Sequence, residues 1–172
     1  MTNITLDKQD KDRDNSDIIN KEDLAKKLAE ETVKQCYLHK TYQSINLSER
    51  NFNLIDLSGS TICNVNFTRS NLKAANLKDA TFSGDFNLTN LRYAQLYYTK
   101  FQRETRFVQA DFSHSNIHQT IANYANFTFA NLNQANIVGT ELNYSEFLQA
   151  RIESTEIIES QFDHAILVGA NL

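Results

Sequence analysis

The chain has 172 residues, the size of one domain, with a net charge of −4 and a mean hydropathy of −0.49. No run of 18 apolar residues exists, which excludes a transmembrane helix. It contains no proline and only 4 glycines, so a fold with many conventional tight turns, such as a Greek-key sandwich, is disfavoured. Asparagine is abundant instead, with 20 copies.

Residues 1–19 are charged and polar, with almost no large apolar side chains, which predicts a disordered tail. They contain no basic region followed by an apolar stretch, so they do not resemble a secretory signal. The two cysteines, Cys36 and Cys63, are too few for a disulfide framework and fit a reducing compartment. We therefore expect a cytoplasmic protein.

Residues 20–37 predict a short α-helix. Asn20 is suited to the N-cap, and Glu22 stabilises the positive end of the helix dipole. Leu24 and Leu28 belong to a weakly apolar stripe on one side. The expected role is to cap the first coil of the region that follows, as solenoids require. The alternative is a helix that docks on another protein.

The remainder, residues 38–172, is dominated by a five-residue repeat that is clear from Ile45 onwards. The pattern is a small residue, Asn or Asp, then Leu, Ile or Phe, then two variable residues, as in Ala75-Asn76-Leu77. Of 26 central residues between Leu47 and Leu172, 25 are Leu, Ile or Phe, and the exception is Ala122. The residue two before the centre is Ala, Ser, Thr or Gly in 22 of 26 repeats.

A period of five is neither helical nor strand-like, and it predicts a chain that turns after each short segment. Four segments would form one square coil of 20 residues. Central residues 20 apart match in type, as in Phe107, Phe127 and Phe147, which a 20-residue coil would require. With coils spaced by about 4.8 Å, residues 45–172 would form a rod roughly 30 Å long.

This pattern resembles the pentapeptide repeat family, whose consensus is A(D/N)LXX, over about three quarters of the chain. The resemblance implies an all-β fold, the right-handed quadrilateral β-helix of a pentapeptide repeat solenoid, and the handedness rests on the resemblance. It also implies a non-enzymatic scaffold or regulator that binds a protein partner. The alternative is a DNA mimic that binds DNA gyrase, a type II topoisomerase, and inhibits or protects it.

The repeat slips twice. Phe82 and Phe86 are four residues apart, and Phe101 and Phe107 are six apart, so the net shift is zero. The simpler interpretation is a tolerated bulge at a corner. The alternative is a small projection that a partner recognises.

Three surface features are candidates for partner binding. An aromatic ladder is expected from 20-residue spacing at Tyr124, Tyr144 and His164, either for a partner or for stacking between coils. An apolar partner face is expected around one column of central phenylalanines. Its members are Val108, Phe129, Leu148, Ile166 and Val168.

The third feature is charge. Residues 45–110 carry a net +3 and residues 111–172 a net −6. The candidate acidic strip consists of Glu141, Glu146, Glu153, Glu156, Glu159 and Asp163. Because duplex DNA carries one charge per ~1.7 Å, this strip would be a dilute mimic. The other interpretation is a solvated surface that keeps the rod soluble.

The last repeats, with Phe162, Leu167 and Leu172, would leave an apolar stack and a strand edge open. Several members of the family dimerise there, so we expect an end-to-end homodimer. The alternatives are a frayed last turn or a fragment that ends within a coil. The sequence shows no catalytic constellation, metal-ligand spacing or phosphate-binding loop. We therefore expect no enzyme activity, cofactor, metal, membrane or direct nucleic-acid binding.

Overall fold

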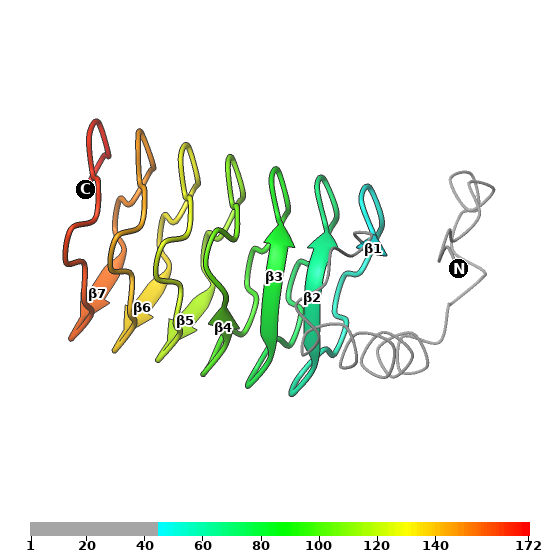
Figure 1. The fold of residues 1–172 in the computed structure, drawn as a ribbon. Coiled ribbons are helices and arrows are strands. Elements are labelled where there is room, and N and C mark those ends of the chain that lie inside the picture. Colours follow the sequence, from blue (N-terminus) through cyan, green and yellow to red (C-terminus); the bar gives the residue numbers. More distant parts are fainter. Residues whose placement is uncertain (1–44) are drawn as a thin grey trace.

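The computed structural model describes residues 45–172, so the predicted tail at 1–19 and helix at 20–37 lie outside the described residues. The described part is a solenoid of about six coils stacked in a row, with β1 towards one end and β7 at the other (Figure 1). Its strands are β1 (Ile45–Asn46), β2 (Thr61–Asn66), β3 (Thr81–Asp85), β4 (Lys100–Phe101), β5 (Asn116–His118), β6 (Asn136–Val138) and β7 (Glu156–Ile158). No helix occurs within residues 45–172.

All strand pairing is parallel and joins each coil to the next. One sheet has the order β1-β2-β3-β4 and the other has the order β5-β6-β7. Asn116 pairs with Asn136 and Asn136 with Glu156, so the register is 20 residues. The β-solenoid and its coil length are therefore confirmed.

Each coil has four walls, which we number by their central residues. Wall 1 contains Phe107, Phe127 and Phe147; wall 2 Phe112, Leu132 and Ile152; wall 3 Ile117, Ile137 and Ile157; wall 4 Ala122, Leu142 and Phe162. Residues at the same repeat position in successive coils form a column that runs along the rod.

The corners explain how the chain turns so often with so little glycine. At 24 corners the second residue after the centre has a positive φ, and at 20 of them this residue is not glycine. In the segment with the extra residue, the positive φ is at Glu104, the third residue after Phe101. The amide three residues after the centre commonly donates to the central carbonyl, as Ala130 N does to Phe127 O at 2.9 Å. This is the geometry of a type II turn. The corner amide is also held by the next coil, as in Phe129 N to Leu148 O at 2.9 Å, which offsets the left-handed backbone.

The asparagines serve the same corners. In ten repeats the Asn or Asp before the centre accepts a hydrogen bond from the backbone N–H two residues later, forming an Asx turn. Asn71 Oδ1 accepts from Lys73 N at 3.1 Å, and Asn71 Nδ2 donates to Asn51 Oδ1 at 3.0 Å in the preceding coil. At Asp56, hydrogen bonds from the Ser58 side chain and backbone hold the carboxyl pKa below its usual value.

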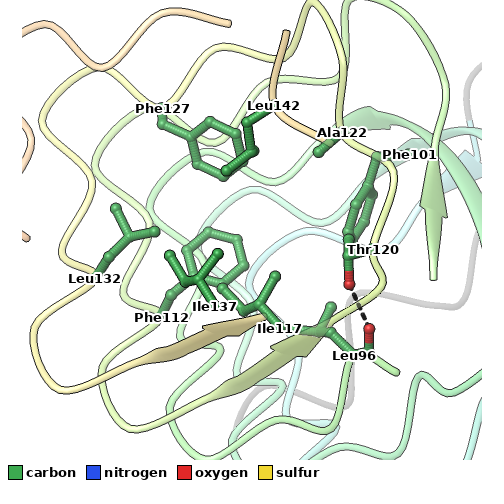
Figure 2. A pocket seen from close by; sticks show the side chains of 10 residues that line it. All are labelled: Leu96, Phe101, Phe112, Ile117, Thr120, Ala122, Phe127, Leu132, Ile137 and Leu142. Atoms are coloured by element: carbon green, nitrogen blue, oxygen red, sulfur yellow. Dashed lines mark hydrogen bonds between the residues drawn. The ribbon is translucent and has the colours of Figure 1, made fainter. Parts of the chain in front are cut away.

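The interior is a continuous apolar stack. The wall 1 rings of Phe107, Phe127 and Phe147 are parallel within 16°, with centroids 4.8–4.9 Å apart, which is the spacing of the coils. A cavity of about 10 Å³ lies beside Ala122, where the other coils have Leu, Ile or Phe, and its lining is apolar apart from Thr120 (Figure 2). Thr120 Oγ1 donates to the Leu96 carbonyl at 2.5 Å, so its hydroxyl is satisfied.

The two slips fall in adjacent coils on wall 4. Ile62 pairs with Phe82 but Val65 pairs with Gly84, because the segment from Phe82 to Phe86 is one residue short. Gly84 is required there, since a Cβ would lie 2.1 Å from the Val65 carbonyl oxygen. The next coil has one residue more, so the columns stay aligned through both slips.

Candidate functional site

The apolar partner face surrounds wall 1 in the later coils. Phe129 is 47% exposed, Leu148 39%, Ile166 49% and Val168 66%, while Val108 is half-buried. Val108, Leu148 and Val168 occupy one column, immediately after the centres. Phe129 stands in the next column, and its amide is bonded to the Leu148 carbonyl. Ile166 lies on the opposite side of wall 1, so the structure brings the five residues onto one wall.

The aromatic ladder lies on the corner that follows wall 4. Tyr124 and Tyr144 are parallel within 2° at 4.9 Å, and Tyr144 and His164 stack at 4.8 Å. The guanidinium of Arg103 lies 3.9 Å from the Tyr124 centroid and extends the stack by a cation–π contact. A spacing of 20 residues does not predict Arg103 as part of the ladder, because the extra residue in its segment places it 21 residues before Tyr124.

A second aromatic group lies on the corner between walls 2 and 3 and on wall 3 itself. The aromatic ladder predicted from the sequence did not include these pairs. Tyr93 and His114 stack at 4.9 Å and 5°, and Tyr97 and His118 approach to 4.9 Å with their planes tilted by 51°. Arg92 lies 5.7 Å from the Tyr93 centroid. These pairs are 21 residues apart because the long segment from Phe101 to Phe107 lies between their members, so a fixed spacing of 20 does not connect them.

The six residues of the candidate acidic strip do not lie on one wall. Their repeat positions place Glu146 on wall 1, Glu153 on wall 2, Glu156 on wall 3 and Glu141 on wall 4. Asp163 follows the wall 4 centre, and Glu159 is on the corner between walls 3 and 4. The carboxylates therefore encircle the later coils rather than lining one side.

Three of these carboxylates, those of Glu141, Glu146 and Glu153, accept hydrogen bonds from asparagine amides, and none of the six forms an ion pair with another described residue. Within residues 45–172 the ion pairs are Arg69–Glu49 and Arg106–Asp85, both in the first half of the solenoid. Asp85 also raises the Arg106 pKa through its hydrogen bond and charge. In the second half, amides take this role: Asn126 Nδ2 donates to Glu146 Oε2 at 2.7 Å. The negative charge of that half is therefore not neutralised locally.

The expected dimer end is apolar and accessible. Leu167 is 37% exposed and Leu172 76%, while Phe162 is half-buried. By contrast, Leu47 and Phe52 at the other end of the described part are buried. Cys63 is also buried and is not a free thiol, which removes the support that the cysteines gave to a reducing compartment.

Chemistry-bearing groups do not converge in the described part. Residues 45–172 contain no cluster of three or more His, Cys, Asp or Glu side chains that could hold a metal ion. In the same range, no helix has the length and apolar character needed to cross a bilayer. A recess at the slips is lined by Asn64, Val65, Ser83, Gly84, Asp85, Arg103, Glu104 and Arg106, and the Asp85–Arg106 ion pair occupies one side of it.

Comparison with known proteins agrees with this architecture. The profile of the Pentapeptide repeats family matches residues 46–84, 110–143 and 123–157 with eight copies. The chain therefore belongs to the pentapeptide repeat family. A comparison with curated protein sequences found no match.

Two solved structures of one protein share the fold with TM-scores above 0.5. A trypsin-treated variant of QnrB1, a plasmid-mediated fluoroquinolone resistance protein, aligns with a TM-score of 0.51 and 19% identity over 73% of this chain and 71% of that one. A second trypsin-treated variant of QnrB1 gives 0.51 and 20% identity, over 73% and 70%. Rfr23, a pentapeptide repeat protein from the cyanobacterium Cyanothece 51142, gives 0.37 and 18% identity, over 70% and 83%.

Proposed function

We propose that this protein is a non-enzymatic scaffold or regulator whose partner protein docks on wall 1 of the later coils. The observation that carries the proposal is the apolar partner face defined above. Single exposed apolar side chains are ordinary on a protein surface, but grouped ones are typical of interaction sites. Four members of this group are between 39% and 66% exposed and lie on one wall.

The wall is also rigid, which favours binding. Its backbone is fixed by bonds from coil to coil, such as Phe127 N to Glu146 O at 2.7 Å and Phe147 N to Ile166 O at 2.7 Å. A partner would therefore order few backbone or side-chain groups on this protein when it binds. Phe129, which is large and 47% exposed, is suited to be the anchor of such an interface.

The test uses purified DNA gyrase as the first partner, in a supercoiling assay and a direct binding assay. Leu148→Asp should weaken binding at least tenfold without changing the circular dichroism spectrum or melting temperature. Leu54→Asp is the matched control, because Leu54 is 65% exposed on the corner after wall 2 and should bind normally. Unchanged binding by Leu148→Asp would contradict wall 1 as the docking surface.

The second candidate function is DNA mimicry towards gyrase. It is favoured by the carboxylates of residues 111–172, none of which forms an ion pair with another described residue. The charge density of this half is low. Its net charge is −6, whereas duplex DNA carries roughly 18 charges over a length of 30 Å. If the protein mimics DNA, its inhibition of gyrase should fall steeply as the salt concentration rises. Inhibition should also fall in the triple variant Glu141→Gln/Glu146→Gln/Glu156→Gln. Salt-independent inhibition would exclude mimicry while leaving docking on wall 1 possible.

A further inference from the structure

Wall 2 of the first three described coils carries basic residues and no carboxylate. Its residues are 50–54, 70–74 and 89–93. The charged residues among them are Arg50, Lys73 and Arg92. Lys73 is exposed and Arg92 is half-buried, and each follows the centre of its repeat, so the two occupy one column in successive coils. Neither forms an ion pair with another described residue, so both charges remain uncompensated.

Tyr93, on the corner that follows wall 2, holds both cations in place. Lys73 Nζ and Arg92 Cζ each lie over its ring, 5.7 Å from the centroid. His114 in the next coil stacks on the same ring at 4.9 Å. These cation–π contacts restrict the two long side chains, which lowers the cost of ordering them when a ligand binds. Arg92 Nε has no hydrogen-bond acceptor among the described residues, so the guanidinium retains a donor that is not satisfied.

An amide ladder lies on the other side of the two cations. Asn71 Nδ2 donates to Asn51 Oδ1 at 3.0 Å, and Asn90 Nδ2 donates to Asn71 Oδ1 at 3.1 Å. Asn71 and Asn90 also accept the backbone N–H groups of Lys73 and Arg92, so the ladder fixes the backbone from which both cations project. We call the surface formed by Lys73, Arg92, Tyr93 and this ladder the basic strip.

The carboxylates around the basic strip lie outside it. Glu49, on the corner before wall 2, pairs with Arg69 at 3.8 Å. Asp56 and Asp79 lie on wall 3 and on its far corner. Asp111 is on wall 2 but one coil further along, where its Oδ1 accepts two hydrogen bonds. The strip is therefore a local positive surface on a chain whose net charge is −4.

We propose that the basic strip binds an extended, acidic segment of a partner protein. Alternate side chains of an extended segment project on one side, about 7 Å apart, while Lys73 and Arg92 start from coils about 4.8 Å apart. Their long side chains can therefore meet two carboxylates in succession, through charge-assisted hydrogen bonds. The strip is on a different wall and in earlier coils than the apolar partner face, so this binding goes beyond the proposed function.

The rings of the basic strip favour an acidic protein over a nucleic acid. Binding of single strands relies on aromatic faces on which bases can stack. His114 covers one face of Tyr93 and two cations lie over the ring, so a base would meet mainly the edge of Tyr93. Two cations would also displace few counter-ions from a phosphate backbone, which favours only weak binding of nucleic acid.

The test is fluorescence anisotropy of a short labelled peptide in which glutamate and serine alternate. The full chain should bind this peptide at about 50 mM NaCl and at least tenfold more weakly at about 500 mM, because the charges are accessible to salt. Lys73→Glu/Arg92→Glu should weaken binding at least tenfold at low salt. Lys73→Glu alone should weaken it at least threefold. Because Lys73 is exposed, this single variant should keep its melting temperature even if a change at Arg92 lowers stability.

The matched control is Lys100→Glu/Arg151→Glu, which changes the net charge equally but on wall 4 and at the far end of wall 2. It should lose less than threefold in affinity for the peptide. Leu148→Asp, which tests wall 1, should bind the peptide like the unsubstituted chain, so the two proposals can fail separately.

Three results would overturn binding of an acidic segment: no binding at low salt, equal losses in the control and in Lys73→Glu/Arg92→Glu, or equal binding of a peptide with glutamine in place of glutamate. A thymidine oligonucleotide that binds more tightly, and is lost in the same variant, would assign the basic strip to nucleic acid instead. Self-association that sedimentation detects in the unsubstituted chain, and that this variant loses, would assign the strip to the acidic half of a second copy.

Discussion

Phe127 shows what a single central residue contributes. Its ring is 4% exposed and lies between Phe107 at 4.9 Å and Phe147 at 4.8 Å, so it contacts the coil on either side. Phe127→Ala should lower the free energy of unfolding by about 3–5 kcal/mol, because it removes buried apolar area and leaves a cavity between two coils. Urea denaturation followed by circular dichroism measures the change.

Phe129 is the matched control for this prediction. It lies two residues away and is 47% exposed, so Phe129→Ala should change stability by less than about 1 kcal/mol. Equal losses in the two variants would mean that the inward and outward positions of the repeat have been assigned wrongly.

Gly84 is the glycine whose replacement the backbone cannot accept. Its φ is 124°, and an added Cβ would meet the carbonyl oxygen and amide nitrogen of Val65 at 2.1 and 2.7 Å. Gly84→Ala should therefore cost about 2–5 kcal/mol, since strain and overpacking add. At Gly59 φ is 65° and no atom lies within 4 Å of the added Cβ, so Gly59→Ala should cost about 1 kcal/mol. Thermal melting of both variants tests this difference in cost. Similar melting temperatures for Gly84→Ala and Gly59→Ala would contradict the special requirement for glycine at position 84.

Within one coil, a large central residue on one wall fills the space left by a small central residue on another wall. The coil with Ala122 is also the coil in which wall 2 has Phe112, where the neighbouring coils have Leu91 and Leu132. Both side chains line the same small cavity in Figure 2. Ala122→Leu restores the consensus but adds more volume than a cavity of about 10 Å³ can hold. We expect it to destabilise the protein by about 1–3 kcal/mol.

The double variant Ala122→Leu/Phe112→Leu should be more stable than the sum of the two single changes predicts, because the shortened side chain makes room for the longer one. Unfolding free energies of the four proteins in this cycle measure the coupling. Additive effects would show that the two positions do not share one space.

The fold of one coil could be predicted from the sequence because the residues that determine it lie within each five-residue repeat. A residue such as Leu132 has a small residue two places before it and an asparagine next to it, and each repeat carries that information. Alignment between coils is not local. Tyr93 and His114 are 21 residues apart only because the segment from Phe101 to Phe107, which lies between them, has one extra residue. A search at a fixed spacing cannot find such a pair until the ladder is known.

The acidic strip failed to form one line for a related reason. The centres next to Glu146, Glu153 and Asp163 belong to walls 1, 2 and 4, so these carboxylates lie on different walls. Counting charges in a sequence interval gives the net charge of a set of coils. It does not give the side of the rod on which each charge lies, which depends on the repeat position and on the wall together.

In the whole molecule, stability should fall towards the last described coil. The amides of Leu142 and Phe147 donate to the carbonyls of Gln161 and Ile166 in the next coil at 2.8 and 2.7 Å. No such bond joins the Phe162 or Leu167 amide to another described residue. Hydrogen exchange followed by NMR should therefore show faster exchange at 162 and 167 than at 142 and 147, by at least a hundredfold.

Dilute protein is the reference condition for that comparison, because association of two copies through this end is weakest at low protein concentration. Strong protection of the Phe162 and Leu167 amides under these conditions would contradict an open last coil. It would indicate that another group covers this end of the solenoid.

The two slips on wall 4 show that the solenoid keeps its alignment by corners and tolerates a change in the number of residues between them. Deleting one complete repeat, for example residues 131–135, would still leave an apolar residue at nearly every centre. It would, however, rotate every later wall by a quarter turn, separate Tyr144 from Tyr124 and move Glu156 to another side of the rod. Deleting twenty residues would shorten the rod by one coil and keep every column continuous. Length in such a protein can therefore change without scrambling its surfaces only in whole coils.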